Sequence, residues 1–370
     1  MNRPFSVYLD LVRFGAACLV YLWHSNMRLL VTDVLPASNY GHSSVIVFFV
    51  LSGFVIAFVT DTKEKTWVEY GASRLSRVYS VVLPTLLLTP LLDYAGRLLY
   101  PALYAYPFDR FALRVLGSGL MLNETWLVSI TYFSNVPYWS IAFEFWYYAL
   151  FALLTFLPAG WRLPCAVALG LAIGPKIVLL LPVWWAGVVL YRWPWLRLRS
   201  KAFSWCLVVI STLSIVLTHR WGVYEMTADW TKGLLGADLF RELTFASRAI
   251  GDYLLALLVF CNFAGMRNVA DSIAPLMLRI ERPVRLLASY TFTLYLLHQP
   301  LFLFWTAMLR GNPDNHRLWW SVTLLTAASV AAIGHFTEHK RHPLRVWLQR
   351  QLQRIAVRVS RRGAPLMPPN

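Results

Sequence analysis

The first apolar segment of the chain, LDLVRFGAACLVYLWH at residues 9–24, contains an arginine and a histidine. Ionisable side chains at bilayer depth are costly, and they persist mainly where they face a polar cavity or take part in function. Arg13 and His24 are eleven residues apart, so on a helix they differ by about 20° around the axis and by roughly 16 Å along it. One helix face therefore carries a cation and a titratable imidazole, although an N-terminal anchor with a hydrogen-bonded core histidine fits the same residues.

Two acidic residues are candidates to act with these basic groups. Asp10 lies three residues before Arg13 and is close enough on a helix to pair with it. Glu144 lies in an aromatic, apolar segment, where an unpaired carboxylate is costly. A carboxylate that accepts a hydrogen bond from one imidazole nitrogen makes the other nitrogen more basic, so we expect Glu144 to assist His24 in general base catalysis.

Three further polar features each allow two interpretations. Arg74 and Arg77 are one helical turn apart and serve either as a topological stop signal or as a clamp for phosphate groups. Ser52, followed by a glycine, allows close helix packing, which we favour, or a local polar opening. His298 lies two residues before Pro300, and we expect it to be structural, because a proline kink requires polar support.

The composition is that of an integral membrane protein. Of the 370 residues, 58% are hydrophobic and 14% are charged, whereas soluble domains carry about 25% charged residues. Apolar windows of spanning length predict an all-α, polytopic transmembrane bundle of about ten helices. Their expected limits are 6–29, 43–61, 78–99, 138–158, 163–179, 180–193, 203–219, 247–265, 287–309 and 318–337.

We expect one transmembrane domain, residues 1–343, followed by a short basic cytoplasmic tail, residues 344–370. The fifth and sixth spans share a stretch that Gly174 and the following proline interrupt. Residues 115–130 form a further apolar stretch, broken by glycines and polar residues, which is either re-entrant or interfacial. The four cysteines lack metal-ligand spacing, and no metal site is predicted.

The basic residues predict the orientation of the bundle. Arginines and lysines gather in the segments after the second, sixth and eighth spans and in the C-terminal tail. By the positive-inside rule, both termini are cytoplasmic and the protein lies in a plasma (inner) membrane. The net charge of +16 therefore reflects topology and anionic lipid contacts, and nucleic-acid binding explains it poorly, because no recognition motif accompanies it.

Taken in order, these segments resemble the membrane-bound acyltransferase family 3, whose members O-acylate carbohydrates and some other acceptors. Each motif alone is mostly apolar, but six of them occur in order around ten expected spans, from about residue 6 to 343. Ser80 is a departure, because the family usually has proline there. The six motifs are LDLVR…H (Leu9 to His24), FFVLSGF (from Phe48), RLSRVY (from Arg74), YWSIAFE (Tyr138, Trp139, Ser140 to Glu144), SYTFTLYLLHQP (from Ser289, with Tyr295 and His298) and a stretched Glu338…Pro343.

The resemblance implies a reaction and roles for its residues. Members take an acyl group, commonly acetyl, from cytoplasmic acyl-CoA and deliver it to a hydroxyl on the far side, so acyl-CoA is a donor substrate and no bound cofactor is expected. Arg13, Arg74 and Arg77 match the positions thought to hold the coenzyme A phosphates. His24 matches the catalytic histidine and Glu144 the motif acid. Supporting roles fall to Asp10, Ser52, Trp139, Ser140, Tyr295 and His298.

Several alternatives remain open at this stage. His24 acts either as a general base on the acceptor hydroxyl or through an acyl-imidazole intermediate. The acceptor is a surface polysaccharide, a lipopolysaccharide, a small glycoside or a peptide-linked sugar, and the acyl group is acetyl or longer. A secondary transporter or a non-catalytic polytopic membrane protein would also bury ionisable residues. The oligomeric state is left open.

Overall fold

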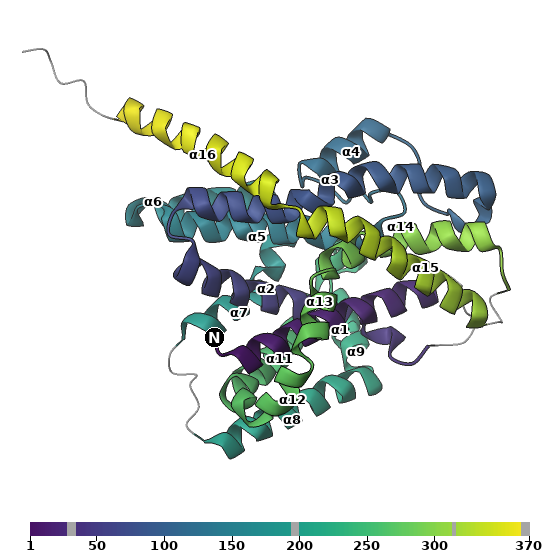
Figure 1. The fold of residues 1–370 in the computed structure, drawn as a ribbon, viewed down its shortest axis with the longest axis horizontal. Coiled ribbons are helices and arrows are strands. Elements are labelled where there is room, and N and C mark those ends of the chain that lie inside the picture. Colours follow the sequence, from purple (N-terminus) through teal and green to yellow (C-terminus); the bar gives the residue numbers. More distant parts are fainter. Residues whose placement is uncertain (28–34, 194–199, 313–315, 364–370) are drawn as a thin grey trace, which may run out of the picture.

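The computed structural model describes residues 1–27, 35–193, 200–312 and 316–363. This part of the chain is helical and contains no β-strand, which confirms the all-α prediction (Figure 1). The longer helices are α1 (Arg3–Met27), α2 (Gly41–Lys63), α3 (Trp67–Leu99), α5 (Trp139–Phe156), α6 (Ala159–Ile173), α7 (Pro175–Arg192), α8 (Lys201–Arg220), α11 (Ala249–Val269), α14 (Thr291–Leu309), α15 (His316–Gly334) and α16 (His342–Gly363). Shorter helices are α4 (Phe111–Gly119), α9 (Val223–Leu235), α10 (Ala237–Glu242), α12 (Ala274–Arg279) and α13 (Glu281–Ala288).

Each of the ten predicted spans corresponds to a helix. Among the described residues, nine helical segments are long and apolar enough to cross a membrane, and α6 is a shorter apolar helix. The predicted limits of the fifth and sixth spans are wrong, because the break falls at Gly174, whose φ of 89° only glycine adopts readily. The third helix begins at Trp67, eleven residues before its predicted start, because Thr66 and Glu69 form a capping box there.

The apolar stretch 115–130 forms the end of α4 and an irregular segment that α7 holds in place. Lys176, at the start of α7, donates to Glu124 at 2.7 Å and to the carbonyl of Val128 at 2.6 Å. The exposed fraction of the side chain is 0% for Lys176 and 2% for Glu124, so the carboxylate and ammonium compensate each other. Leu122 and residues 126–128 of this segment are exposed, so the ion pair fixes one side of it while the other side faces outward.

Two of the prolines inside the long helices, Pro300 and Pro90, receive polar support from neighbouring segments. Pro300 has no N–H group, so the carbonyl of Leu296 lacks its usual donor in α14. Asn135 supplies that hydrogen bond through Nδ2 at 2.6 Å. His298 contacts the neighbouring carbonyls of Leu294 and Tyr295 instead, so its expected structural role in this turn stays a prediction. The same arrangement recurs in α3, where the Tyr132 hydroxyl donates at 2.6 Å to Leu86, the residue four positions before Pro90.

Helices α2 and α7 approach each other through glycines. A Cβ atom on Gly53 would lie 2.0 Å from the carbonyl oxygen of Trp184, and one on Gly187 would lie 1.9 Å from that of Val50. This confirms close packing at the Ser52–Gly53 pair. It also fixes the face of α2 from which Ser52 projects toward α5.

The C-terminal tail is helical in the part that the structure describes. Helix α16 begins at His342, one residue before the expected domain limit, and packs along α3. Its far end extends beyond the other helices (Figure 1).

We predict that Gly187→Ala destabilises the bundle, because the added methyl group would push α2 and α7 apart. The matched control is Gly15→Ala in α1, where a Cβ atom would meet nothing within 4 Å and where alanine should gain about 0.5–1 kcal/mol in helix propensity. Thermal unfolding of both purified variants in detergent tests this. Equal melting temperatures for the two variants would contradict the close-packing interpretation.

Candidate active site

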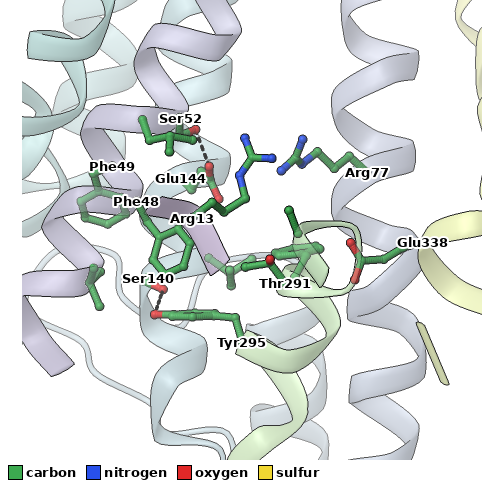
Figure 2. A pocket seen from close by; sticks show the side chains of 15 residues that line it. Arg13, Phe48, Phe49, Ser52, Arg77, Ser140, Glu144, Thr291, Tyr295 and Glu338 are labelled. Atoms are coloured by element: carbon green, nitrogen blue, oxygen red, sulfur yellow. Dashed lines mark hydrogen bonds between the residues drawn. The ribbon is translucent and has the colours of Figure 1, made fainter. Parts of the chain in front are cut away.

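A small cavity of about 70 Å³ lies among α1, α2, α3, α5 and α14, and we call it the arginine cavity (Figure 2). Two arginines and two glutamates provide its charges. Its lining residues are Arg13, Val45, Phe48, Phe49, Leu51, Ser52, Arg77, Ser140, Ile141, Glu144, Ala288, Thr291, Phe292, Tyr295 and Glu338. Segments that are far apart in the sequence thus contribute to one polar site inside an apolar bundle.

The guanidinium groups of Arg13 and Arg77 point toward each other in this cavity (Figure 2). Arg13 also donates to Asp10 at 3.2 Å, which confirms the predicted pair, and Asp10 accepts from Arg285 at 3.0 Å. Two facing cations repel each other where little water can screen them. An anion bound between them would relieve this repulsion and could accept hydrogen bonds from both guanidinium groups.

Arg74 lies outside the arginine cavity. Its Nη2 donates to Glu64 at 2.5 Å, and both residues are buried. The predicted three-arginine clamp is therefore not assembled in one place, because Arg74 compensates Glu64 while Arg77 faces Arg13. Arg341, which the sequence did not single out, lies within electrostatic range of Arg77.

The two glutamates of the cavity have different partners. Glu144 accepts hydrogen bonds from the Ser52 hydroxyl and, at 2.5 Å, from the Tyr148 hydroxyl. Glu338 accepts from the backbone N–H of Thr293 at 2.8 Å. Glu338 lies in a π-helical turn, His335–His339, that follows α15. The closing motif indicated this glutamate, but a π turn cannot be read from the sequence, and Glu338 was not among the predicted site residues.

Ser140 and Tyr295 close one end of the arginine cavity, joined by a hydrogen bond of 2.7 Å (Figure 2). The neighbouring Trp139 does not line this cavity among the described residues. Its ring instead stacks on Phe245, with centroids 4.3 Å apart and planes 3° from parallel.

His24 and His298 form a buried pair next to that end of the cavity. Nε2 of His298 lies 3.1 Å from Nδ1 of His24, and the two side chains belong to residues that are 1% and 7% exposed. His298 also contacts Tyr295, whose carbonyl oxygen lies 2.8 Å from its Nδ1. The described contacts thus give His24 a histidine neighbour, while the predicted partner Glu144 bonds to Ser52 and Tyr148.

Backbone carbonyls determine the tautomers of both rings. A carbonyl oxygen only accepts, so Nδ1 of His298 carries a hydrogen for Tyr295, and Nδ1 of His24 carries one that points toward Val20 at 2.9 Å. Nε2 of neutral His298, 3.1 Å from Nδ1 of His24, shares that one hydrogen with the Val20 carbonyl. The lone pair of neutral His24 then resides on Nε2, which is the nitrogen that can take up a proton.

No group of three or more histidine, cysteine, aspartate or glutamate side chains suited to a metal ion occurs in the ranges that the structure describes. The chemistry that the described site supports is proton transfer by an imidazole, combined with binding of an anion by two arginines.

Comparisons with known proteins agree with the motif pattern. The family model described as an acyltransferase domain (acyltransferase family 3) matches residues 6–335. The exopolysaccharide production protein ExoZ of Rhizobium meliloti (strain 1021) is 34% identical over 137 residues, or 36% of this chain. That match spans 40% of the length of ExoZ. No solved structure is significantly similar to the chain.

We predict that Arg74→Met and Arg77→Met have different effects on stability. Arg74→Met leaves the buried Glu64 without its cation, and removing one partner of such a pair typically costs about 3–5 kcal/mol. Arg77→Met removes a charge that faces Arg13, so it should leave the thermal stability unchanged or raise it. Melting temperatures of the two purified variants measure this difference. A larger loss for Arg77→Met would show that its charge is needed for folding.

Proposed function

The chain belongs to this acyltransferase family, and on that premise we propose that it is an integral membrane O-acyltransferase. It takes an acyl group, acetyl in the simplest case, from cytoplasmic acyl-CoA and transfers it to a hydroxyl of a carbohydrate on the opposite side. The observation that carries the proposal is that α1 contributes Arg13 to the arginine cavity and His24 to a buried histidine pair. The similarity to ExoZ, an exopolysaccharide production protein, supports a polysaccharide acceptor.

The acyl-CoA donor enters from the side of the bundle on which the N-terminal ends of α1 and α3 lie. Basic residues are concentrated on this side, which supports a cytoplasmic location for both termini. Arg13 and Arg77 bind phosphate oxygens of coenzyme A, because a planar guanidinium offers paired donors. The acyl arm then extends along α1, on which Arg13 and His24 are separated by roughly 16 Å.

His24 acts as the general base. Nε2 of His24 takes the proton of the acceptor hydroxyl as the hydroxyl oxygen forms its bond to the acyl carbon. The carbon–sulfur bond then breaks, and the departing thiolate of coenzyme A receives that proton from the imidazolium. In the alternative two-step route, Nε2 itself takes the acyl group before the hydroxyl attacks.

His298 acts as a positioning residue for this step. It accepts a hydrogen bond from Nδ1 of His24, as the aspartate does in a Ser-His-Asp triad, but without a negative charge. Glu144 has a different task, because it lies with Arg13 in the arginine cavity and lowers the cost of holding two guanidinium groups there.

The decisive experiment follows the acyl group. Membranes from a strain that lacks the protein, and from the same strain complemented with it, are incubated with labelled acetyl-CoA. Mass spectrometry of glycans and lipids then identifies the molecule that gains the mass of an acyl group. Uptake of a labelled solute without any acylated product would favour a transporter.

We predict that His24→Ala abolishes transfer and that His298→Ala lowers it by roughly 10²-fold, the lower end of a typical general acid–base contribution. His298→Gln should recover part of the loss, because the glutamine side chain can place an oxygen near Nδ1 of His24. Acetyl transfer rates at equal protein levels test this. Equal rates for the alanine and glutamine variants at position 298 would mean that His298 only fills space.

We also predict that Arg13→Lys and Arg77→Lys each weaken coenzyme A binding about tenfold, because an ammonium group cannot reproduce the paired donors of a guanidinium. Arg74→Lys is the matched control, since its partner is Glu64. Calorimetric titration of purified protein with coenzyme A measures the affinities. If Arg74→Lys weakens binding as much as Arg77→Lys does, Arg74 belongs to the donor site.

A further inference from the structure

A second cavity, of about 400 Å³, lies at the other end of α1, among the end of α8, the start of α2 and α9. We call it the aromatic cavity, because Trp23, Tyr224 and Phe245 line it together with hydrogen-bonding side chains. Its volume falls in the range of about 300–1,000 Å³ that is usual for small-molecule sites. None of its lining residues belongs to the arginine cavity.

Buried polar pairs hold the walls of the aromatic cavity in place. Nε2 of His42, on α2, lies 2.9 Å from Oδ1 of Asp252, which also accepts from the Tyr224 hydroxyl at 2.8 Å. The Ser43 hydroxyl lies 2.7 Å from Nε2 of His219, on α8. These contacts join α2, α8, α9 and α11, so the cavity is organised before a ligand arrives.

One wall residue has features that a ligand would explain. Thr244 has a φ of 48°, a conformation that costs a β-branched residue energy and that is often found at binding sites. Its buried hydroxyl oxygen has no hydrogen-bond partner among the described residues. A hydroxyl group of a ligand in the cavity could serve as that partner.

The chemistry of the lining favours a neutral sugar. Asn39, Ser43 and Thr244 offer neutral donors and acceptors, and one glutamate, Glu225, is balanced by one arginine, Arg248. The two histidines of the lining already have partners, because His42 pairs with Asp252 and His219 with Ser43. A phosphate would require several cations without a carboxylate, and an acyl chain would require an apolar lining. The cavity between α6 and α7, of about 520 Å³, has such an apolar lining and differs from the aromatic cavity in this respect.

Trp23 connects the aromatic cavity to the histidine pair. It lines the cavity and precedes His24 on α1, and the centroids of the two rings are 5.0 Å apart. Trp23 also packs against the start of α2, because a Cβ on Gly41 would lie 2.2 Å from its ring. A ligand that contacts Trp23 in the cavity is therefore one side chain away from the imidazole of His24.

We propose that the aromatic cavity is the acceptor subsite and that it binds an uncharged, hydroxyl-rich sugar ring. This proposal rests on the acyltransferase function and names the part of the chain that selects its acceptor. The apolar face of the sugar packs on Trp23 and Phe245, and its hydroxyls bond to Asn39, Thr244 and Glu225. One hydroxyl at the edge of the ring is thereby directed toward His24.

The test measures sugar binding separately from acyl transfer. The probe is an oligosaccharide cut from the extracellular polysaccharide of the host strain, freed of acyl groups with mild base and labelled with a fluorophore. Its equilibrium binding to the purified full-length protein, without acyl-CoA, is followed by fluorescence anisotropy. Phe245→Ala and Glu225→Gln are compared with Trp230→Ala, an exposed residue that does not line the cavity.

We expect Phe245→Ala and Glu225→Gln each to weaken probe binding at least tenfold and to raise the acceptor KM, while Trp230→Ala binds as the parent does. Glu225 is exposed, so the glutamine variant tests the proposal even if Phe245→Ala unfolds. Unchanged binding in both variants, no binding by the parent, or displacement of the probe by inorganic phosphate would overturn the proposal. Sugar binding without acetyl transfer would instead contradict the proposed function and leave the subsite in place.

Discussion

A bilayer core contains no water, so each polar group that the bundle buries must find its partner within the protein. This requirement explains much of the described structure. Carbonyls that prolines leave without donors receive hydrogen bonds from Asn135 and Tyr132. Lys176 neutralises Glu124, and Arg74 neutralises Glu64. The charges of these two pairs are compensated within the fold, although Oε2 of Glu64 and Nε of Arg74 have no hydrogen-bond partner among the described residues.

Arg13 and Arg77 are arranged differently from Arg74, although Arg13 also pairs with Asp10. Arg74 forms an ion pair with the buried carboxylate of Glu64. Arg13 and Arg77 instead face each other in the arginine cavity, which they line together with Glu144 and Glu338. Like charges at such a distance are unfavourable, and a fold retains them where an incoming anion compensates them. The close contact of α2 with α7 contributes here, because it holds Ser52 against the carboxylate that lies beside Arg13.

The sequence predicted the helices well and the partners within the site less well. Apolar length fixes a spanning helix, and i to i+3 spacing fixes the Asp10–Arg13 pair, because both are local properties. The neighbour of His24 is His298, which lies 274 positions further along the chain, so it depends on how α1 packs against α14. Arg74 and Arg77 look equivalent along the sequence, but they project about 60° apart around α3. Because of this difference, Arg74 contacts Glu64 and Arg77 lines the arginine cavity.

The residues of the aromatic cavity were the hardest to predict. His42 and Asp252 are 210 positions apart, and neither lies in a motif that the sequence analysis used to place the site. A carboxylate–imidazole pair was expected, and one exists, but it joins these two residues. These residues meet because the ends of α1, α2, α8 and α11 that carry them lie together in the bundle. A single sequence does not reveal which helix ends meet.

The proposed reaction requires the acyl arm to pass the hydrogen bond between Ser140 and Tyr295. These residues line the arginine cavity, His298 contacts Tyr295, and His24 does not line the cavity among the described residues. The proposed phosphate site and the imidazole of His24 therefore lie on opposite sides of the Ser140–Tyr295 hydrogen bond. For this reason the proposed reaction depends on these two side chains as much as on the charged groups, although neither of them is ionised.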